Sequence, residues 1–136
     1  MADGELTETA WLLQSKVNPF PVPGELALRG GRITFDLGTL ASGAFVGWVG
    51  DEIAEPQLKE RLEAGETVRA FEFATTDVEV SWPKLYGGSW MQVEPKGGGR
   101  TWIIAYDNPS GGSITQTMSI FSGRKKGKAW KAALGH

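Results

Sequence analysis

The densest group of side chains that could do chemistry in this sequence is a run of cations near the C-terminus. Its members are Arg124, Lys125, Lys126, Lys128 and Lys131. They follow Ser122, the predicted N-cap of a helix, and the free backbone amides of a helix N-terminus attract anions just as cations do. The run predicts a site for a phosphate, an acidic peptide or an anionic membrane surface. The alternative is a solvated helix face that balances an otherwise acidic domain.

Two further cations, Arg29 and Arg32, flank the pair Gly30-Gly31. A glycine pair between two alternating apolar runs is typical of a two-residue β-hairpin, because glycine supplies the positive φ angles that such a turn needs. So tight a turn leaves little room for a deep pocket. Arg29 and Arg32 are therefore the weaker candidates for anion binding.

Aromatic side chains form the second group with functional potential. Phe45 and Trp48 lie in residues 40–49, an apolar and glycine-interrupted segment outside the clear strand pattern, and Trp90 lies in a segment without clean alternation. Exposed aromatic side chains dominate many protein interfaces, so these three are the predicted anchors for a protein partner or for self-association. The alternatives are that residues 40–49 tuck across an open sheet edge and that the tryptophans fill the sheet interior.

The sequence lacks most of the side chains that usually serve in catalysis and metal binding. The chain has no cysteine, and its one histidine is the last residue, His136. Without these groups, thiolate sites and the serine and cysteine nucleophile mechanisms lose their central members. Candidate carboxylates fall where acids are common anyway, on polar strand faces and in turns; they are Asp36, Asp51, Glu79, Glu94 and Asp107. We therefore expect no enzyme activity, no metal and no cofactor.

Composition indicates one globular domain. The 136 residues carry a net charge of −2, with 40% apolar and 22% charged side chains. A charge this close to zero does not favour nucleic-acid binding. The first residues lack the basic and apolar segments of a secretory signal, and the longest mostly apolar stretch, residues 45–49, is too short to span a bilayer. We expect a cytoplasmic protein without a transmembrane segment.

Periodicity indicates strands along most of the chain. Apolar residues at helical spacing predict a helix over residues 6–17, and a proline-rich strap follows up to residue 23. Alternation predicts strands over residues 25–29, 32–37, 68–74, 77–82, 89–94, 100–106 and 113–121. A second helix is predicted over residues 53–64, and residues 122–134 form an amphipathic helix with Trp130 in its apolar stripe.

This order of elements resembles that of pleckstrin-homology (PH) domains, and of the bacterial PH-like and GRAM-type domains in particular. The opening hairpin GELALRGGRITFDL fits the pattern G-x-L-x-L-x-x-x-R-I-x-F, and the terminal helix carries Trp130. The resemblance covers residues 24–135, with residues 1–23 as a preceding helix and strap. It implies a mainly β (α+β) fold, a bent seven-stranded antiparallel barrel capped by the C-terminal helix. The helix over 53–64 would be an insertion between the second and third strands.

Two functions follow as expectations. The first is a non-catalytic binding or adaptor domain that contacts a protein partner through an aromatic or apolar surface. The alternative is a binder of anionic ligands or membrane surfaces that uses the basic C-terminal helix. In PH domains that bind phosphoinositides, basic residues after the first strand grip the ligand, but the short hairpin at Arg29 and Arg32 does not carry that function over.

Overall fold

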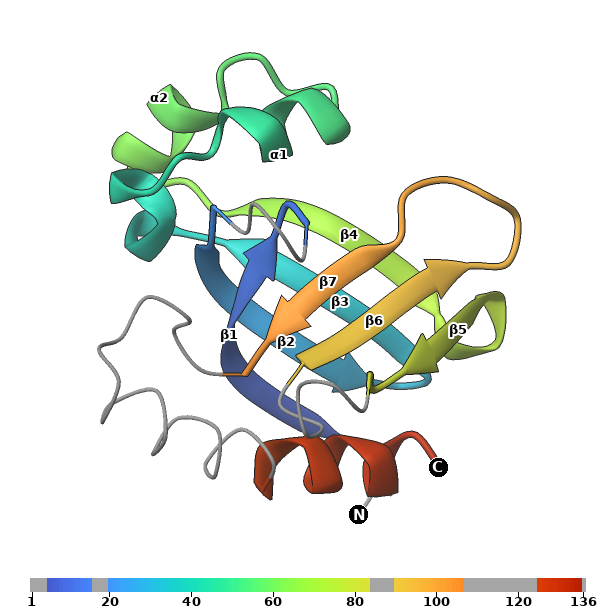
Figure 1. Cartoon of the computed structure of the whole chain (residues 1–136). Helices are drawn as coiled ribbons and strands as arrows, with labels where there is room; N and C mark the ends of the chain where they lie inside the picture. The colour runs from blue at the N-terminus through green and yellow to red at the C-terminus, as the bar shows by residue number, and fades with distance from the viewer. Residues whose placement is uncertain (1–4, 16–19, 84–89, 107–124, 136) are drawn as a thin grey trace.

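A computed structural model describes residues 5–15, 20–83, 90–106 and 125–135. Within these residues, seven strands form one antiparallel sheet in the order β4-β3-β2-β1-β7-β6-β5 (Figure 1). The strands are β1 (Leu6–Leu13), β2 (Val22–Arg29), β3 (Arg32–Leu37), β4 (Val68–Ala74), β5 (Val78–Ser81), β6 (Trp90–Pro95) and β7 (Trp102–Ala105). The predicted β-rich fold is thus confirmed.

Strand β1 joins the two halves of the sheet. The strands β2, β3 and β4 follow it as one meander, and β5, β6 and β7 form another. Leu12 of β1 lies opposite Val22 of β2 on one side and opposite Ile104 of β7 on the other. The boundary drawn at residue 24 therefore falls inside β2, and residues 6–13, which precede it, belong to the same sheet.

The helix predicted over residues 6–17 is wrong where the structure describes it, because residues 6–13 form β1. The inward-facing positions of this strand include Leu6, Glu8, Ala10 and Leu12, so a carboxylate interrupts the apolar alternation. Glu8 is accommodated there because Lys126 lies 3.1 Å from its carboxylate. A strand whose inner face carries a paired charge loses the period-two signal that marks it in sequence.

The hairpin predicted at Gly30-Gly31 is confirmed. The two glycines have φ angles of +56° and +74°, and Arg29 pairs with Arg32 across the turn. Another glycine, Gly24, makes a close approach in β2: a Cβ atom there would lie 2.5 Å from the backbone oxygen of Asp36 and even closer to the ring of Phe35. The absence of a side chain at Gly24 is what lets the Phe35 ring lie across the strand.

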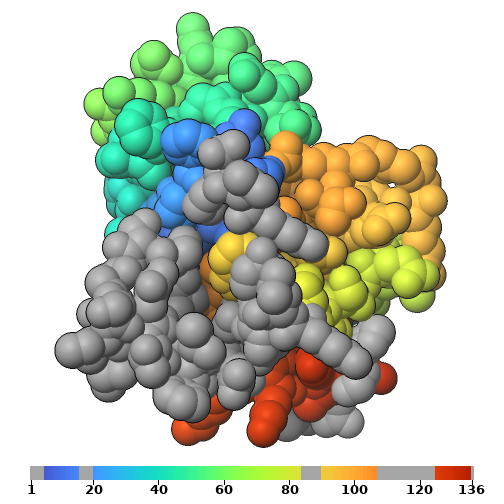
Figure 2. Space-filling view, viewed as in Figure 1, coloured from blue at the N-terminus to red at the C-terminus, as the bar shows by residue number. Residues whose placement is uncertain are grey.

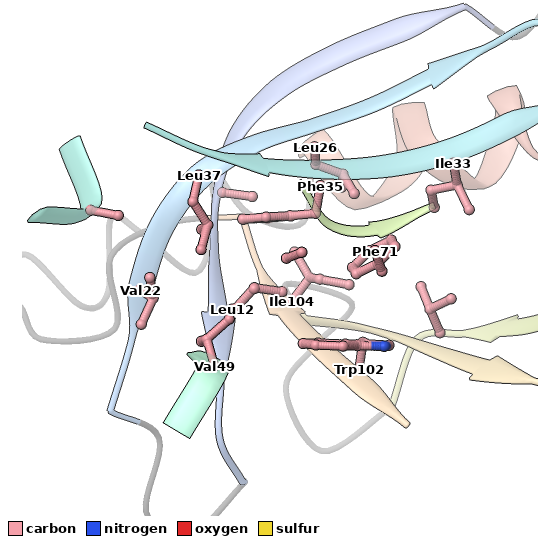
Figure 3. Packing of buried hydrophobic residues seen from close by; sticks show 14 of the residues in the cluster. Leu12, Val22, Leu26, Ile33, Phe35, Leu37, Val49, Phe71, Trp102 and Ile104 are labelled. Atoms are coloured by element: carbon pink, nitrogen blue, oxygen red, sulfur yellow. The ribbon is translucent and has the colours of Figure 1, made fainter. Parts of the chain in front are cut away.

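The sheet bends around its main core and does not close within the described residues. Phe71 of β4 and Trp102 of β7 approach across the core with ring centroids 5.3 Å apart, although several strands separate them in the sheet. Figure 3 shows that the side chains of these strands converge, with Leu12, Phe35 and Ile104 among them. Among the described strands, β4 and β5 are the two edges of the sheet, so the expected bent barrel is corrected to a bent sheet that does not close within this part of the chain.

Helical elements lie at both ends of the molecule (Figure 1). Between β3 and β4 the chain forms η1 (Thr39–Gly43), α1 (Gly47–Glu52) and α2 (Leu58–Glu63), while η2 (Thr75–Asp77) connects β4 to β5. The helix predicted over residues 53–64 is confirmed only for α2, since Ala54 has a positive φ of 56° that breaks a helix. Residues 125–133 are helical, as predicted for that part of the C-terminal helix.

The remaining strand predictions agree with the structure to within a few residues. Strands β4, β5, β6 and β7 fall where alternation placed them. The strand predicted over residues 113–121 lies outside the described residues. The structure thus has seven strands in its described part because β1 adds one that the sequence pattern did not reveal.

Replacing Gly24 by alanine is expected to destabilise the fold by about 2–3 kcal/mol, because backbone at Asp36 and a buried ring must both move. Gly38→Ala is the matched control: a Cβ at Gly38 meets nothing within 4 Å. It should change stability by less than about 0.5 kcal/mol. Urea unfolding of both variants measures the difference, and equal stabilities would contradict the close packing at Gly24.

Candidate functional site

Two phenylalanines stand exposed at the end of the molecule formed by residues 39–66, which we call the helical cap. Phe45 is 78% exposed and Phe20 is 46% exposed, although both are large apolar side chains. Their ring centroids lie 6.2 Å apart with the ring planes at 85°, which is an edge-to-face contact. We call these two residues the aromatic pair. Figure 2 shows the helical cap as the green end of the molecule.

Trp48 contacts the backbone of the aromatic pair at Phe20. It lies in α1, is partly buried, and packs against the core. Its indole Nε1 donates a hydrogen bond of 3.0 Å to the backbone oxygen of Phe20. Phe20 has a positive φ of 37°, a conformation that a residue with a side chain rarely adopts. The structure thus places Trp48, a predicted partner anchor, where it fixes the position of Phe20.

Arg100 fastens the helical cap to the sheet. Its guanidinium carbon lies 4.8 Å from the ring centroid of Trp48 and 5.6 Å from that of Trp102. The same group donates a hydrogen bond of 2.8 Å to Glu52 and another to the backbone oxygen of Gln14. Arg100 therefore connects α1 to residues that adjoin β1 and β7. No sequence pattern singled it out, because its partners come from distant parts of the chain.

A pocket of about 270 Å³ opens beside Phe45, between α1 and α2. Its apolar lining includes Phe45, Val46, Pro56 and Leu58, and its polar lining consists of Asp51, Glu55, Lys59 and Glu60. At this pocket α1 passes close to the connection to α2, since a Cβ atom at Gly50 would lie 2.8 Å from the backbone oxygen of Glu55.

The helical cap is strongly acidic. Residues 39–66 hold six acidic and two basic side chains, and so have a net charge of −4. Arg61 forms ion pairs with Glu55 at 2.7 Å and with Glu66 at 3.1 Å, and the hydrogen bonds that it donates to Glu66 and to Glu55 raise its pKa. Asp51 and Glu60 have no ion-pair partner among the described residues. The pocket beside Phe45 is thus rimmed by carboxylates that remain available.

The basic C-terminal helix is only partly free to bind anions. Lys126 lies 3.1 Å from Glu8 and donates a hydrogen bond of 3.2 Å to the backbone oxygen of Tyr106. The Lys131 ammonium lies 5.6 Å from the ring centroid of Trp82. Lys125 and Lys128 are exposed, and Arg124 lies outside the described residues. The structure therefore gives Lys126 a structural contact and leaves Lys125 and Lys128 at the surface.

The helix is held to the sheet by Trp130, which is fully buried, as the sequence predicted. Its ring stacks against that of Tyr106, with centroids 6.5 Å apart. The Tyr106 hydroxyl accepts a hydrogen bond of 2.8 Å from Trp82 and donates one of 3.2 Å to the Met91 sulfur. Burial raises the pKa of Tyr106, and the hydrogen bond from Trp82 opposes that rise only in part. Tyr106 therefore stays a neutral structural group.

The two arginines of the β2–β3 hairpin already have partners. Arg29 donates a hydrogen bond of 3.1 Å to the Thr7 hydroxyl, and Arg32 forms an ion pair of 2.7 Å with Glu72. Hydrogen bonds from Arg32 and from Arg69 lower the pKa of Glu72, so this carboxylate stays ionised at neutral pH. Glu72 balances the charge of Arg32, which reduces its attraction for an added anion.

Trp90, the third predicted partner anchor, lies away from the aromatic pair. It is partly buried and packs with Trp11 against a small cluster made by Leu13, Ile103 and Ala105. Trp11 of β1 and Trp90 of β6 both lie opposite Ala105 of β7, one on each side. The structure therefore does not bring Trp90 together with Phe45 and Trp48. It adds Phe20 instead, which sequence analysis overlooked inside a proline-rich segment.

Truncating Trp130 to alanine is expected to destabilise the domain by about 3–5 kcal/mol, because the side chain fills the core beneath the helix. Lys125→Ala, an exposed position five residues earlier in the same helix, should change stability by less than about 0.5 kcal/mol. Thermal and urea unfolding compare the two variants. Similar losses from both would show that the helix does not dock through Trp130.

Lys126→Ala should destabilise the domain by about 1–2 kcal/mol, because it removes a charged hydrogen-bond donor from Glu8 and Tyr106. Lys128→Ala is its matched control, since Lys128 is exposed in the same helix. Its expected effect is below about 0.5 kcal/mol. If Lys126→Ala proves as neutral as Lys128→Ala, the ion pair with Glu8 does not hold the helix.

Within residues 5–15, 20–83, 90–106 and 125–135, no group of three or more histidine, cysteine or acidic side chains could hold a metal ion. In that same part of the chain, no helix is long and apolar enough to cross a membrane. Comparison with the models of known protein families and with curated proteins finds no match to this chain.

Proposed function

We propose that this chain is a non-catalytic binding module that contacts a protein partner, or a second copy of itself, through the aromatic pair on the helical cap. The observation that carries the proposal is the exposure of Phe45 and Phe20. Their ring centroids lie 6.2 Å apart, and neither side chain is buried in the core. Each phenylalanine contributes about 1.5–3 kcal/mol when it moves from water into an apolar contact. Two adjacent rings supply the kind of anchor around which interfaces form.

The rigidity of the aromatic pair supports the same function. The hydrogen bond from Trp48 fixes the backbone of Phe20, and Trp48 itself is held against Arg100. A surface that is ordered before binding loses little conformational entropy when a partner arrives. The aromatic pair is thus built to bind without rearrangement.

We further propose that the domain is PH-like. The features that support this identity are the meander from β1 to β4, the second meander from β5 to β7, and the terminal helix that inserts Trp130 into the core. The structure also explains the residue types at the motif positions of the opening hairpin. Leu26 pairs with Phe35, Leu28 pairs with Ile33, and Gly24 makes room for the Phe35 ring.

The basic helix offers weaker support for the alternative of an anionic ligand. Lys126 is balanced by Glu8, and Lys131 lies over the Trp82 ring, so Lys125 and Lys128 are the exposed cations of the described helix. Two exposed lysines attract an anionic membrane surface by only about 1 kcal/mol each. The aromatic pair is the stronger candidate.

Photo-crosslinking tests the proposed contact surface. Benzoyl-phenylalanine replaces Phe45 in one variant and Glu79, an exposed residue of β5, in the control, and both proteins are irradiated in cells of the natural source. Position 45 should give a discrete protein adduct that position 79 does not give. The mass of the adduct separates a partner from a second copy of the chain.

The second substitution Phe20→Ser should reduce the adduct from position 45 by about tenfold or more, since it removes half of the aromatic pair. Circular dichroism and thermal unfolding check that this variant stays folded. No adduct from position 45, or the same adducts from positions 45 and 79, would refute the proposed contact surface.

A further inference from the structure

We infer that the pocket beside Phe45 accepts an arginine side chain of a protein partner. The inference rests on the proposed function, because it names what the partner of the aromatic pair presents to the helical cap. Its basis is the combination of one exposed aromatic wall, a pocket between α1 and α2, and a carboxylate rim.

The size of the pocket suits a single side chain. Its volume is about 270 Å³, and it lies open to the surface between Phe45 and the two helices. Sites that enclose a whole small molecule usually measure about 300–1,000 Å³. A long side chain that reaches in from a segment lying across Phe45 fits this pocket better than an independent small molecule does.

The negative charge of the pocket lining favours binding of a cationic group. Asp51, Glu55 and Glu60 line it together with one ammonium group, that of Lys59. Glu55 is balanced by Arg61 at 2.7 Å, whereas Asp51 and Glu60 have no ion-pair partner among the described residues. An incoming cation gains these two carboxylates, and an anionic lipid or nucleic acid would be repelled by the net charge of −4 on residues 39–66.

Arginine is favoured over lysine because one wall of the pocket is aromatic. A guanidinium group stacks on an aromatic face and at the same time donates paired hydrogen bonds to carboxylates. The protein uses this arrangement itself nearby: Arg100 lies over the rings of Trp48 and Trp102 and donates to Glu52. Phe45 with Asp51 and Glu60 offers a partner the same set of groups from outside.

Two matched peptides test the inference by NMR titration of the ¹⁵N-labelled protein. The probes are acetyl-Leu-Arg-Leu-amide and acetyl-Leu-citrulline-Leu-amide, which differ by one charge and otherwise share their shape. The arginine peptide should shift amide signals of residues 44–60 and bind at least about tenfold more tightly than the citrulline peptide. Its affinity should fall at least about threefold when NaCl rises from about 50 to about 300 mM.

Substitutions identify the carboxylates. The double variant Asp51→Asn with Glu60→Gln should weaken binding of the arginine peptide at least about fivefold. Glu63→Gln is the matched control, because Glu63 is an exposed acid of α2 that does not line the pocket, and it should change affinity less than about twofold. Amide spectra outside the helical cap check that both variants keep the fold.

Three results would overturn the inference: equal affinities of the two peptides, shifts that centre on other acidic residues such as Glu79 and Glu94, or no shifts up to about 10 mM peptide. If one of these occurs while position 45 still crosslinks to a protein, the partner contacts the aromatic pair without an arginine. If crosslinking at position 45 fails as well, the proposed function itself is wrong.

Discussion

The two-sided pairing of β1 is the constraint on which the rest of the structure depends. Leu12 lies between Val22 and Ile104, so one strand hydrogen-bonds to both meanders, which the chain joins in sequence through η2. The inner face of the same strand offers Glu8 to Lys126 and thereby orients the helix that carries Trp130. The sheet and the terminal helix thus meet on β1.

Much of the fold could be predicted from the sequence because local patterns encode it. Alternating apolar residues marked β3 and β4, the Gly30-Gly31 pair marked the turn between β2 and β3, and helical spacing placed Trp130 on an inner face. Strand β1 could not be predicted from the local pattern because its inner face contains Glu8. The partner of Glu8, Lys126, lies 118 positions away in the sequence. Sheet closure also depends on such contacts, so sequence periodicity could not show that the described strands form a bent sheet that does not close.

The candidate site was predictable only in part. Phe45 could be identified because it lies in an apolar segment outside any strand pattern, and its exposure of 78% agrees with a surface role. Phe20 and Arg100 could not be found, because each acquires its role through Trp48, a residue remote from both in sequence. The basic run was the clearest signal in the sequence, yet Glu8 and Trp82 engage two of its members in the folded chain.

The construction of the helical cap explains how the aromatic pair stays exposed. A left-handed conformation at Phe20 costs about 1–2 kcal/mol, and strain of this kind persists only where surrounding contacts determine the backbone. Those contacts are present: Trp48 donates to the Phe20 carbonyl, and Arg100 holds Trp48 while it pairs with Glu52. The strained backbone at Phe20 and the stacking of Arg100 on Trp48 therefore hold the two phenylalanines in an exposed position. Exposed apolar rings that are stabilised in this way are expected where a protein binds, because folding alone gains nothing from their position.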